Sequence, residues 1–592
     1  MRTHLLVAAL GICVMLVLAP NGAGAQTPPP VIAPQEDALT PPPPPPSLSD
    51  ADNRGPSQYM AGRVAVQVLL PQSDNPAHAW SQPQITQIHD QIQAALDWWV
   101  ARLPLARLSF TVRLQVVPIT YEPMSYGLVD EGRWIGDVLS RLGYTGSSYF
   151  SQAYAADRAL RDELGADWVT TIFVANSSGA SGGTFPDGRF AYAYINGPFM
   201  VLTSDVGGYG AARMAPVVAH ELGHIFGALD QYAAARVSCA QESGYLSVPT
   251  TNSQYNSCGT NLPSIMLEIL GSFSNGQIDP SAMAQVGYRD SDSDGLIDPL
   301  DTTTELNLAP MLTPEPGARP LLSGQSRDVA FPSPSNQDVS INQISAVEYR
   351  VDGGIWLPTK AADGSFDSGD EDFSTTLPLY DGEYLVEVRA RNSAGVESPL
   401  SSGHVTVSQV GPQPSYYPSL PPFTAHAEIL VRLDAPDGTQ SVQISADLGF
   451  GAAAWQRYSP ELSFSLDGRD GVQTVYVRYR DAAGLVSLPI ALDVVLDTTP
   501  PDGSAARDPQ NSTRLILKAH DDGTGVAEVG IELGGSDPLW MTYQADISLS
   551  GLAGLTADTP SMRVLFRDAA GNTSLPYTVT SDYAVFLPLV VR

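Results

Sequence analysis

The segment Val217-Val-Ala-His220-Glu221-Leu-Gly-His224-Ile-Phe-Gly227-Ala-Leu-Asp230 carries two histidines four residues apart. On a helix, residues with this spacing share a face, so His220 and His224 can offer imidazole nitrogens to one metal ion. Glu221 stands beside them and can act as a base on water. Gly227 permits the positive φ that ends a helix, so the chain can return Asp230 as a third ligand. Three protein ligands with an open fourth position are typical of a catalytic Zn²⁺ site.

The alternative without a metal is that the His-Glu-x-x-His pattern arose by chance in an ordinary buried helix. With 8 histidines in 592 residues, chance produces the pattern in roughly three of a thousand such chains. The apolar residues around it also predict a helix seated in a core. The sequence therefore favours a metal site.

The extended spacing His220-Glu221-x-x-His224-x-x-Gly227-x-x-Asp230 resembles the zinc signature of the metzincin metallopeptidases, in the snapalysin-like variant with Asp as third ligand. The resemblance implies a methionine turn below the zinc, and Pro263-Ser264-Ile265-Met266 follows at a suitable distance. Met266 would then pack beneath the metal without binding it. The implied activity is zinc-assisted hydrolysis of peptide bonds, with Glu221 as the base.

The resemblance covers residues 59–289. It implies that substrate binds as an extended strand at a sheet edge, for which Phe190–Ile195 is the expected segment. Glu268 occupies the position two residues after Met266 where some metzincins carry a tyrosine, so no residue is assigned to stabilise the oxyanion. No cysteine lies between residue 26 and this domain, which excludes a thiolate form of latency.

Periodicity predicts a mixed α/β domain. Val64, Val66, Val68 and Leu70 alternate as in a strand, and a helix pattern follows Pro83. Further strands are expected at 108–117 and 169–174, with helices near 134–142 and 153–164.

Residues 1–25 have the pattern of an export signal, with Arg2, an apolar run and a small-residue stretch before Gln26. Residues 26–58 include the unbroken run Pro41–Pro46 and are expected to be an extended linker or pro-segment. No other stretch is long and apolar enough to span a membrane. The expected location is secreted or extracellular, with attachment to a cell surface left open.

Cys239 and Cys258 remain once the signal is removed. In an oxidising compartment, an even pair predicts a disulfide. The alternative, two thiolates of a metal site, lacks a second cysteine pair nearby.

A second metal-like run occupies residues 290–301. Counted from Asp290, carboxylates fall at positions 1, 3, 5, 9 and 12, with Gly295 at position 6, as in an EF-hand-like Ca²⁺ loop. It resembles the single calcium loops of dockerin and thrombospondin type 3 repeats; the alternative is a solvated acidic linker. The expected ligands are Asp290, Asp292, Asp294, Leu296 through its carbonyl, Asp298 and Asp301.

Three later segments share an alternating strand that runs into an Asn/Asp-x-Ala-Gly turn. The turn glycines Gly395, Gly484 and Gly571 lie 89 and 87 residues apart. This period suits whole β-sandwich domains. The segments resemble bacterial immunoglobulin-like domains, expected at 302–408, 409–499 and 500–592, either as a passive stalk or as binding modules.

The fold class expected is thus multidomain: an α/β, metzincin-like domain followed by three all-β sandwiches. Asp and Glu total 63 against 31 Lys and Arg, a net charge of −32 that argues against nucleic-acid partners. We expect a zinc metallopeptidase that acts on proteins or peptides, with sandwiches that provide spacing or attachment to a surface or polymer. Two alternatives stay open: an adhesion or binding protein with an inactive or structural zinc site, and zinc hydrolysis of a non-peptide amide.

Overall fold

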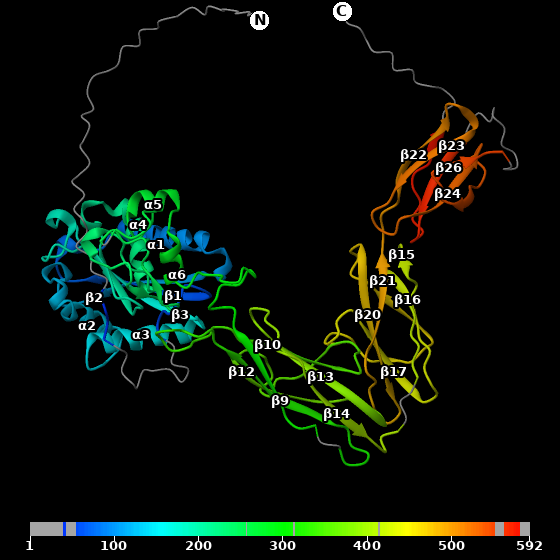
Figure 1. The fold of residues 1–592 in the computed structure, drawn as a ribbon, viewed down its shortest axis with the longest axis horizontal. Coiled ribbons are helices and arrows are strands. Elements are labelled where there is room, and N and C mark those ends of the chain that lie inside the picture. The colour runs from blue at the N-terminus through cyan, green and yellow to red at the C-terminus, as the bar shows by residue number, and fades with distance from the viewer. Residues whose placement is uncertain are drawn as a thin grey trace, which may run out of the picture. The chain divides into compact units, whose positions relative to one another are not determined.

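The computed structural model divides the chain into two compact units, residues 1–298 with 332–339, and residues 299–331 with 340–592 (Figure 1). It describes residues 39–42, 55–255, 257–311, 314–411, 415–550 and 562–579. The expected export signal, most of segment 26–58 and the last part of the third sandwich lie outside the described residues. Among the described residues, no helix combines the length and apolar character that a membrane span requires.

A five-stranded sheet forms the centre of the first unit, in the order β2-β1-β3-β5-β4. Strands β2, β1, β3 and β5 pair in parallel, and only the edge strand β4 is antiparallel. The strands are β1 (Arg63–Gln72), β2 (Ser109–Pro118), β3 (Trp168–Ala175), β4 (Ala191–Ala193) and β5 (Phe199–Thr203). A separate two-stranded ribbon consists of β6 (Glu242–Ser243) and β7 (Val248–Pro249).

Helices cover both faces of this sheet (Figure 1). Helices α1 and α4 contact each other on one face, and α2 and α3 pack together on the other. Because both faces are covered, β3 is buried along its whole length, as parallel strands require. The helices are α1 (Gln82–Arg102), α2 (Gly132–Arg141), α3 (Tyr149–Leu164), α4 (Met214–Ile225), α5 (Ile269–Asn275) and α6 (Pro280–Gln285).

The predicted strands and helices of this unit are confirmed to within a few residues. Helix α1 begins after Ser81, whose backbone N–H donates a hydrogen bond to Gln84 Oε1 at 3.0 Å, as in a capping box. The helix buries Ile88, Ile92 and Trp99 at the expected spacing.

Residues 332–339 belong to the first unit, although the sequence placed them in the first sandwich. The Tyr245 hydroxyl accepts a hydrogen bond from the Val339 N–H at 3.0 Å, and Ser333 Oγ donates to the Tyr245 carbonyl at 2.6 Å. Tyr245 in turn packs edge-on against Tyr59 of the same unit. These contacts explain why segment 332–339 belongs to the first unit and not to the first sandwich.

The second unit consists of β-sandwich-type domains, each built from two sheets over its own apolar core; the pairs are antiparallel except that of β15 (Phe423–Thr424) with β21 (Ile490–Leu496), which is parallel. The first has sheets β11-β10-β13-β14 and β12-β9-β8. Its strands are β8 (Thr303–Leu308), β9 (Leu321–Val329), β10 (Ile344–Val351), β11 (Leu357–Pro358), β12 (Asp370–Thr376), β13 (Gly382–Asn392) and β14 (Ser401–Val407).

The second sandwich has sheets β15-β21-β20-β17-β18 and β16-β19, and the third has β22-β23-β26 and β25-β24-β27-β28. Strands of the second are β15 (Phe423–Thr424), β16 (Glu428–Arg432), β17 (Thr439–Ser445), β18 (Gln456–Arg457), β19 (Glu461–Ser465), β20 (Gly471–Asp481) and β21 (Ile490–Leu496). Strands of the third are β22 (Asp502–Asp508), β23 (Asn511–His520), β24 (Val526–Leu533), β25 (Leu539–Thr542), β26 (Asp546–Ser548), β27 (Met562–Asp568) and β28 (Tyr577–Val579).

One tryptophan in each sandwich lies against arginine from the strand that leads into the shared turn. The guanidinium carbons lie 3.5–4.4 Å from the ring centroids in the pairs Trp356–Arg389, Trp455–Arg480 and Trp540–Arg567. Such cation–π contacts reach across the intervening strand of the same sheet, from the end of the sheet that carries the tryptophan to the strand that leads into the turn.

Candidate metal centre

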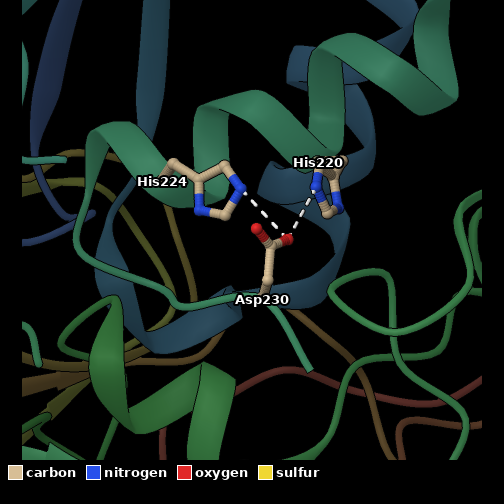
Figure 2. Close-up of side chains that lie close together, drawn as sticks. All are labelled: His220, His224 and Asp230. Carbon is tan, nitrogen blue, oxygen red and sulfur yellow. Dashed lines mark ion pairs between the residues drawn. The ribbon is translucent and has the colours of Figure 1, made fainter. Parts of the chain in front are cut away.

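Helix α4 supplies the histidine pair and the glutamate. All twelve of its residues are buried, so the helix is surrounded by core and the three polar side chains are enclosed with it. His220 and His224 lie one turn apart on the same face (Figure 2). Glu221 follows His220 directly and is fully buried.

The chain leaves α4 through a tight turn at Gly227, which has φ +94°. A Cβ at this position would lie 2.7 Å from Gly244 Cα and 3.1 Å from Asn196 Oδ1. Both the backbone conformation and the close approach therefore require glycine. The turn brings Asp230 back to face the two histidines.

The two histidines and Asp230 converge on one point (Figure 2). Asp230 Oδ1 lies 3.2 Å from His220 Nε2 and 3.3 Å from His224 Nε2. The three side chains are each about 1% exposed. The geometry joins the three ligands that the sequence proposed for one metal ion.

Backbone carbonyls determine which histidine nitrogens carry protons. His220 Nδ1 lies 2.9 Å from the Ile265 carbonyl, and His224 Nδ1 lies 2.7 Å from the Ala228 carbonyl. A carbonyl only accepts, so both Nδ1 atoms donate, and in neutral imidazoles the Nε2 atoms keep lone pairs. Two lone pairs then face one carboxylate oxygen, which is repulsive unless a cation or extra protons lie between them.

Without a metal, the close approach of these side chains shifts the pKa values of His224 and Asp230. Burial lowers the pKa of His224, but the Asp230 carboxylate outweighs burial and raises that pKa above its usual value. Burial opposes ionisation of Asp230, but the two histidines outweigh it and hold the carboxyl pKa below its usual value. The carboxylate thus stays ionised and available as a metal ligand, and a divalent cation can replace the protons it attracts.

Met266 lies directly against α4. It is fully buried, and a Cβ at Gly223 would lie 2.8 Å from its Sδ atom. Its carbonyl accepts a hydrogen bond from the Gln231 N–H at 2.9 Å, which ties this turn to the residue after Asp230. Met266 packs against α4 at Gly223, the residue before His224, and the missing Cβ of this glycine makes room for it.

Tyr232 is a site residue that sequence reasoning missed. Its hydroxyl donates to Asp230 Oδ2 at 3.2 Å, leaving Oδ1 to face the histidines. A hydrogen bond to the second carboxylate oxygen fixes the orientation of a metal ligand. The only signal in the sequence is a tyrosine two residues after the third ligand.

A buried polar network, also missed, holds the loops around the site. Asp279 Oδ2 accepts from Gln231 Nε2 at 2.5 Å and from Ser264 Oγ at 2.9 Å. Asn252 Nδ2 donates to Gln231 Oε1 at 2.9 Å. The network joins the segment after Asp230 to the methionine turn.

Glu268 caps helix α5, because its carboxylate accepts from the Gly271 and Ser272 N–H groups, both at 3.1 Å. It therefore has a local structural role. Cys239 and Cys258 form the predicted disulfide, with an S–S distance of 2.05 Å.

The structure brings together only part of the expected calcium loop. Asp290, Asp292 and Asp294 place oxygens within 4.8 Å of one another. Asp298 instead pairs with Arg289 Nε at 2.6 Å and accepts from the Ser291 N–H at 2.8 Å, because a buried carboxylate needs a charged or hydrogen-bonding partner. The Leu296 N–H donates to Asp294, and Asp301 lies in the second compact unit.

A further group of carboxylates, not foreseen from the sequence, lies in the second unit. Asp497, Asp521 and Asp568 place oxygens within 4.8 Å of one another. Backbone and side-chain donors engage them, including the Thr524 hydroxyl on Asp497 and the Gly525 N–H on Asp521.

No protein-family model matches the chain, and no curated protein matches it. Among solved structures, the fibronectin FN1–FN3 domains of chicken CNTN1 are 12% identical, with 46% of this chain and 98% of that chain covered and a TM-score of 0.20. The fibronectin(III)-like modules of Clostridium thermocellum CbhA are 17% identical, with 33% and 94% covered and a TM-score of 0.13. Bacteroides ovatus SGBP-B, solved with a mixed-linkage heptasaccharide, is 12% identical, with 40% and 60% covered and a TM-score of 0.17.

Proposed function

We propose that this chain is a secreted zinc endopeptidase of the metzincin type, which cleaves extracellular proteins or peptides. One observation carries the proposal: two buried histidine Nε2 atoms lie within 3.3 Å of one carboxylate oxygen while carbonyls hold both Nδ1 atoms. This donor set suits Zn²⁺, which binds neutral imidazole nitrogen and carboxylate oxygen. Zinc-bound histidines usually donate the N–H of their other ring nitrogen to a backbone carbonyl or a carboxylate, as the two Nδ1 atoms do here.

In this proposal, His220, His224 and Asp230 hold the zinc. When bound, Zn²⁺ would supply Lewis-acid polarisation of the scissile carbonyl and of the attacking water. Glu221 would accept the proton of that water and pass it to the departing amine nitrogen. Tyr232 and the two carbonyls would keep the ligands oriented, and the enclosed helix would keep the base in a fixed position.

Two further features support a peptidase. Met266, in a separate turn, is buried against α4 at Gly223, which fits the methionine turn that the resemblance implies. The antiparallel edge strand β4 contacts α4, and the Asn196 N–H that follows β4 donates to the His224 carbonyl at 3.2 Å. An extended peptide added to this edge would lie beside the metal ligands.

The test is cleavage of an unfolded, unspecific protein substrate by the full chain loaded with zinc. Glu221→Gln removes the base without changing the size of the side chain, and we expect it to lower kcat by about 100-fold or more at equal zinc content. Glu242→Gln, at an exposed glutamate of the same unit, is the matched control and should keep full activity. Equal activity of the two variants would refute the assignment.

A second candidate is an extracellular binding or adhesion protein in which the metal site does not catalyse. It is favoured by the large part of the chain, residues 302–331 and 340–579, that forms β-sandwich-type domains. Zinc binding with no hydrolysis of any peptide, in both the parent chain and Glu221→Gln, would favour this candidate. We also propose that Asp290, Asp292 and Asp294 bind Ca²⁺, which isothermal titration of the chain and of Asp292→Asn would test.

A further inference from the structure

A cavity lies at the carboxyl edge of the central sheet of the first unit. It has a volume of about 270 Å³ and is lined by segments that follow β1, β3 and β5. In parallel α/β sheets, ligands bind outside the carboxyl ends of the strands, where successive connections leave in opposite directions. Here the chain runs from β1 to β2 on one side and from β3 towards β5 and β4 on the other. The described residues that line the cavity include neither Glu221 nor any of the three metal ligands.

Two buried serines just after β3 and β5 line this cavity and leave one hydroxyl proton for a ligand. Ser177 Oγ accepts a hydrogen bond from the Asp205 N–H at 3.1 Å, and Ser204 Oγ accepts one from the Ser177 N–H at 3.0 Å. The two hydroxyl oxygens lie 3.2 Å apart, so one serine donates to the other. The serine that accepts keeps its own proton for an acceptor in the cavity.

A further hydroxyl is held at the wall by the first turn of α1. Gln84 Nε2 donates to Ser178 Oγ at 2.9 Å, and the Ser178 N–H donates to Asn176 Oδ1 at 3.0 Å. The Ser178 hydroxyl thus accepts from the glutamine and has its proton available to donate. The cavity therefore offers hydroxyl donors at two fixed positions.

One carboxylate and one aromatic ring complete the wall. Asp205 is half-buried and is the only charged side chain among the described residues that line the cavity. An ionised carboxylate only accepts hydrogen bonds. The Trp80 indole N–H donates to the Pro71 carbonyl at 2.9 Å, so the ring is fixed and offers carbon surface to the cavity.

We propose that this cavity binds one neutral sugar ring. A pyranose presents adjacent hydroxyl groups, which donate and accept, together with apolar C–H groups that pack on an aromatic ring. The wall offers the matching set: an acceptor at Asp205, hydroxyl donors at the serines and a ring at Trp80. Pockets for drug-sized ligands begin at about 300 Å³, so this slightly smaller volume suits one ring better than a chain of sugars.

The same lining argues against other small ligands. Phosphates and carboxylates would lack a partner, because no lysine or arginine is among the described lining residues and the chain has a net charge of −32. Ca²⁺ takes about six to eight oxygen ligands, and one carboxylate beside serines that already bond to each other supplies too few. An organic ammonium ion is the remaining competitor, because it also pairs with a carboxylate and an aromatic ring.

The test is saturation-transfer NMR of the full chain with the methyl pyranosides of glucose, galactose, mannose and N-acetylglucosamine. We expect at least one to bind with a Kd of about 1 mM, as a ligand of this size should. Asp205→Asn keeps the shape of the side chain and removes its charge, so binding should weaken about tenfold, and Ser178→Ala should weaken it about threefold. Asp97→Asn, at an exposed aspartate of α1 that does not line the cavity, is the matched control and should leave Kd unchanged.

Hydrogen exchange locates the bound sugar and checks the fold of the variants. The amides of Ser177 and Asp205 should exchange about threefold more slowly when the sugar is bound. The slowest amides of β1 and β3 should exchange equally in the parent and in all three variants, which shows that a weaker Kd does not come from unfolding.

Three results would overturn the proposal. The first is that no pyranoside binds at about 50 mM, and the second is that Asp205→Asn and Ser178→Ala bind the sugar as tightly as the parent. The third is that tetramethylammonium binds in place of the sugars and is lost in Asp205→Asn, which would assign the cavity to a cation. Because the cavity shares no residue with the metal centre, each of these results leaves the proposed peptidase as it stands.

Discussion

Substitution of Gly227 by alanine gives a sharp test of how the third ligand is positioned. The glycine has φ +94°, and a left-handed conformation costs a residue with a Cβ about 1–2 kcal/mol. The new Cβ would also lie 2.7 Å from Gly244 Cα, and overpacking against backbone costs about 1–3 kcal/mol. We therefore expect Gly227→Ala to lower the free energy of unfolding of the first unit by about 3 kcal/mol.

The assay is native-state hydrogen exchange of the slowest amides in β1 and β3, which reports the stability of this unit separately from the sandwiches. Gly188→Ala is the matched control, because Gly188 has φ +87° and no atom within 4 Å of the added Cβ. Gly188→Ala should lower the free energy of unfolding only by the cost of the left-handed backbone conformation. Equal losses for the two variants would refute the argument that the contact with Gly244 matters, and zinc affinity should fall only in Gly227→Ala.

Three further predictions concern other parts of the first unit. Tyr232→Phe removes the hydrogen bond to Asp230 Oδ2, so zinc affinity measured by chelator competition should fall about tenfold. Burial raises the pKa of Asp157 to about 8, so this group favours the folded state while protonated. Its contribution to stability should fall by about 1.4 kcal/mol per pH unit between about pH 4 and pH 8, and Asp157→Asn should remove that slope in urea unfolding. Replacing Cys239 and Cys258 by serine should destabilise the unit by about 3 kcal/mol in thermal unfolding, because the disulfide closes a loop with a separation of 19.

Each of these predictions has a control within the chain. Tyr255→Phe, at a tyrosine 49% exposed, should leave zinc affinity unchanged. A pH slope that persists in Asp157→Asn would show that another group titrates in this range. A serine variant as stable as the oxidised parent would contradict the stabilising role of the disulfide.

Local patterns were sufficient to predict the helices and strands of the first unit and to indicate the ligand set. The spacing of His220 and His224 follows from the helical turn alone, and Gly227 signals the reversal that returns Asp230. The repeated Ala-Gly turns predicted three β-sandwiches because each ends a strand of regular alternation. In these cases the deciding contacts lie close together in the sequence.

Features that depend on distant contacts could not be predicted in this way. Tyr232 has its role only because the turn after Gly227 points its hydroxyl at Asp230. Asp298 fits the spacing of a calcium loop, but Arg289 takes its carboxylate into an ion pair. The pairing of Leu39 with β4 crosses more than 150 residues of chain, and no local periodicity reports it.

The acceptor of His220 Nδ1, the Ile265 carbonyl, lies 45 residues further along the chain. The histidine pair on α4 therefore gains its final orientation only after the methionine turn has been synthesised and has docked. A partly folded chain that already contains the whole signature holds an unoriented His220 and lacks a finished site. In the proposed secreted peptidase, this delay would protect the newly made protein from hydrolysis before its folding is complete.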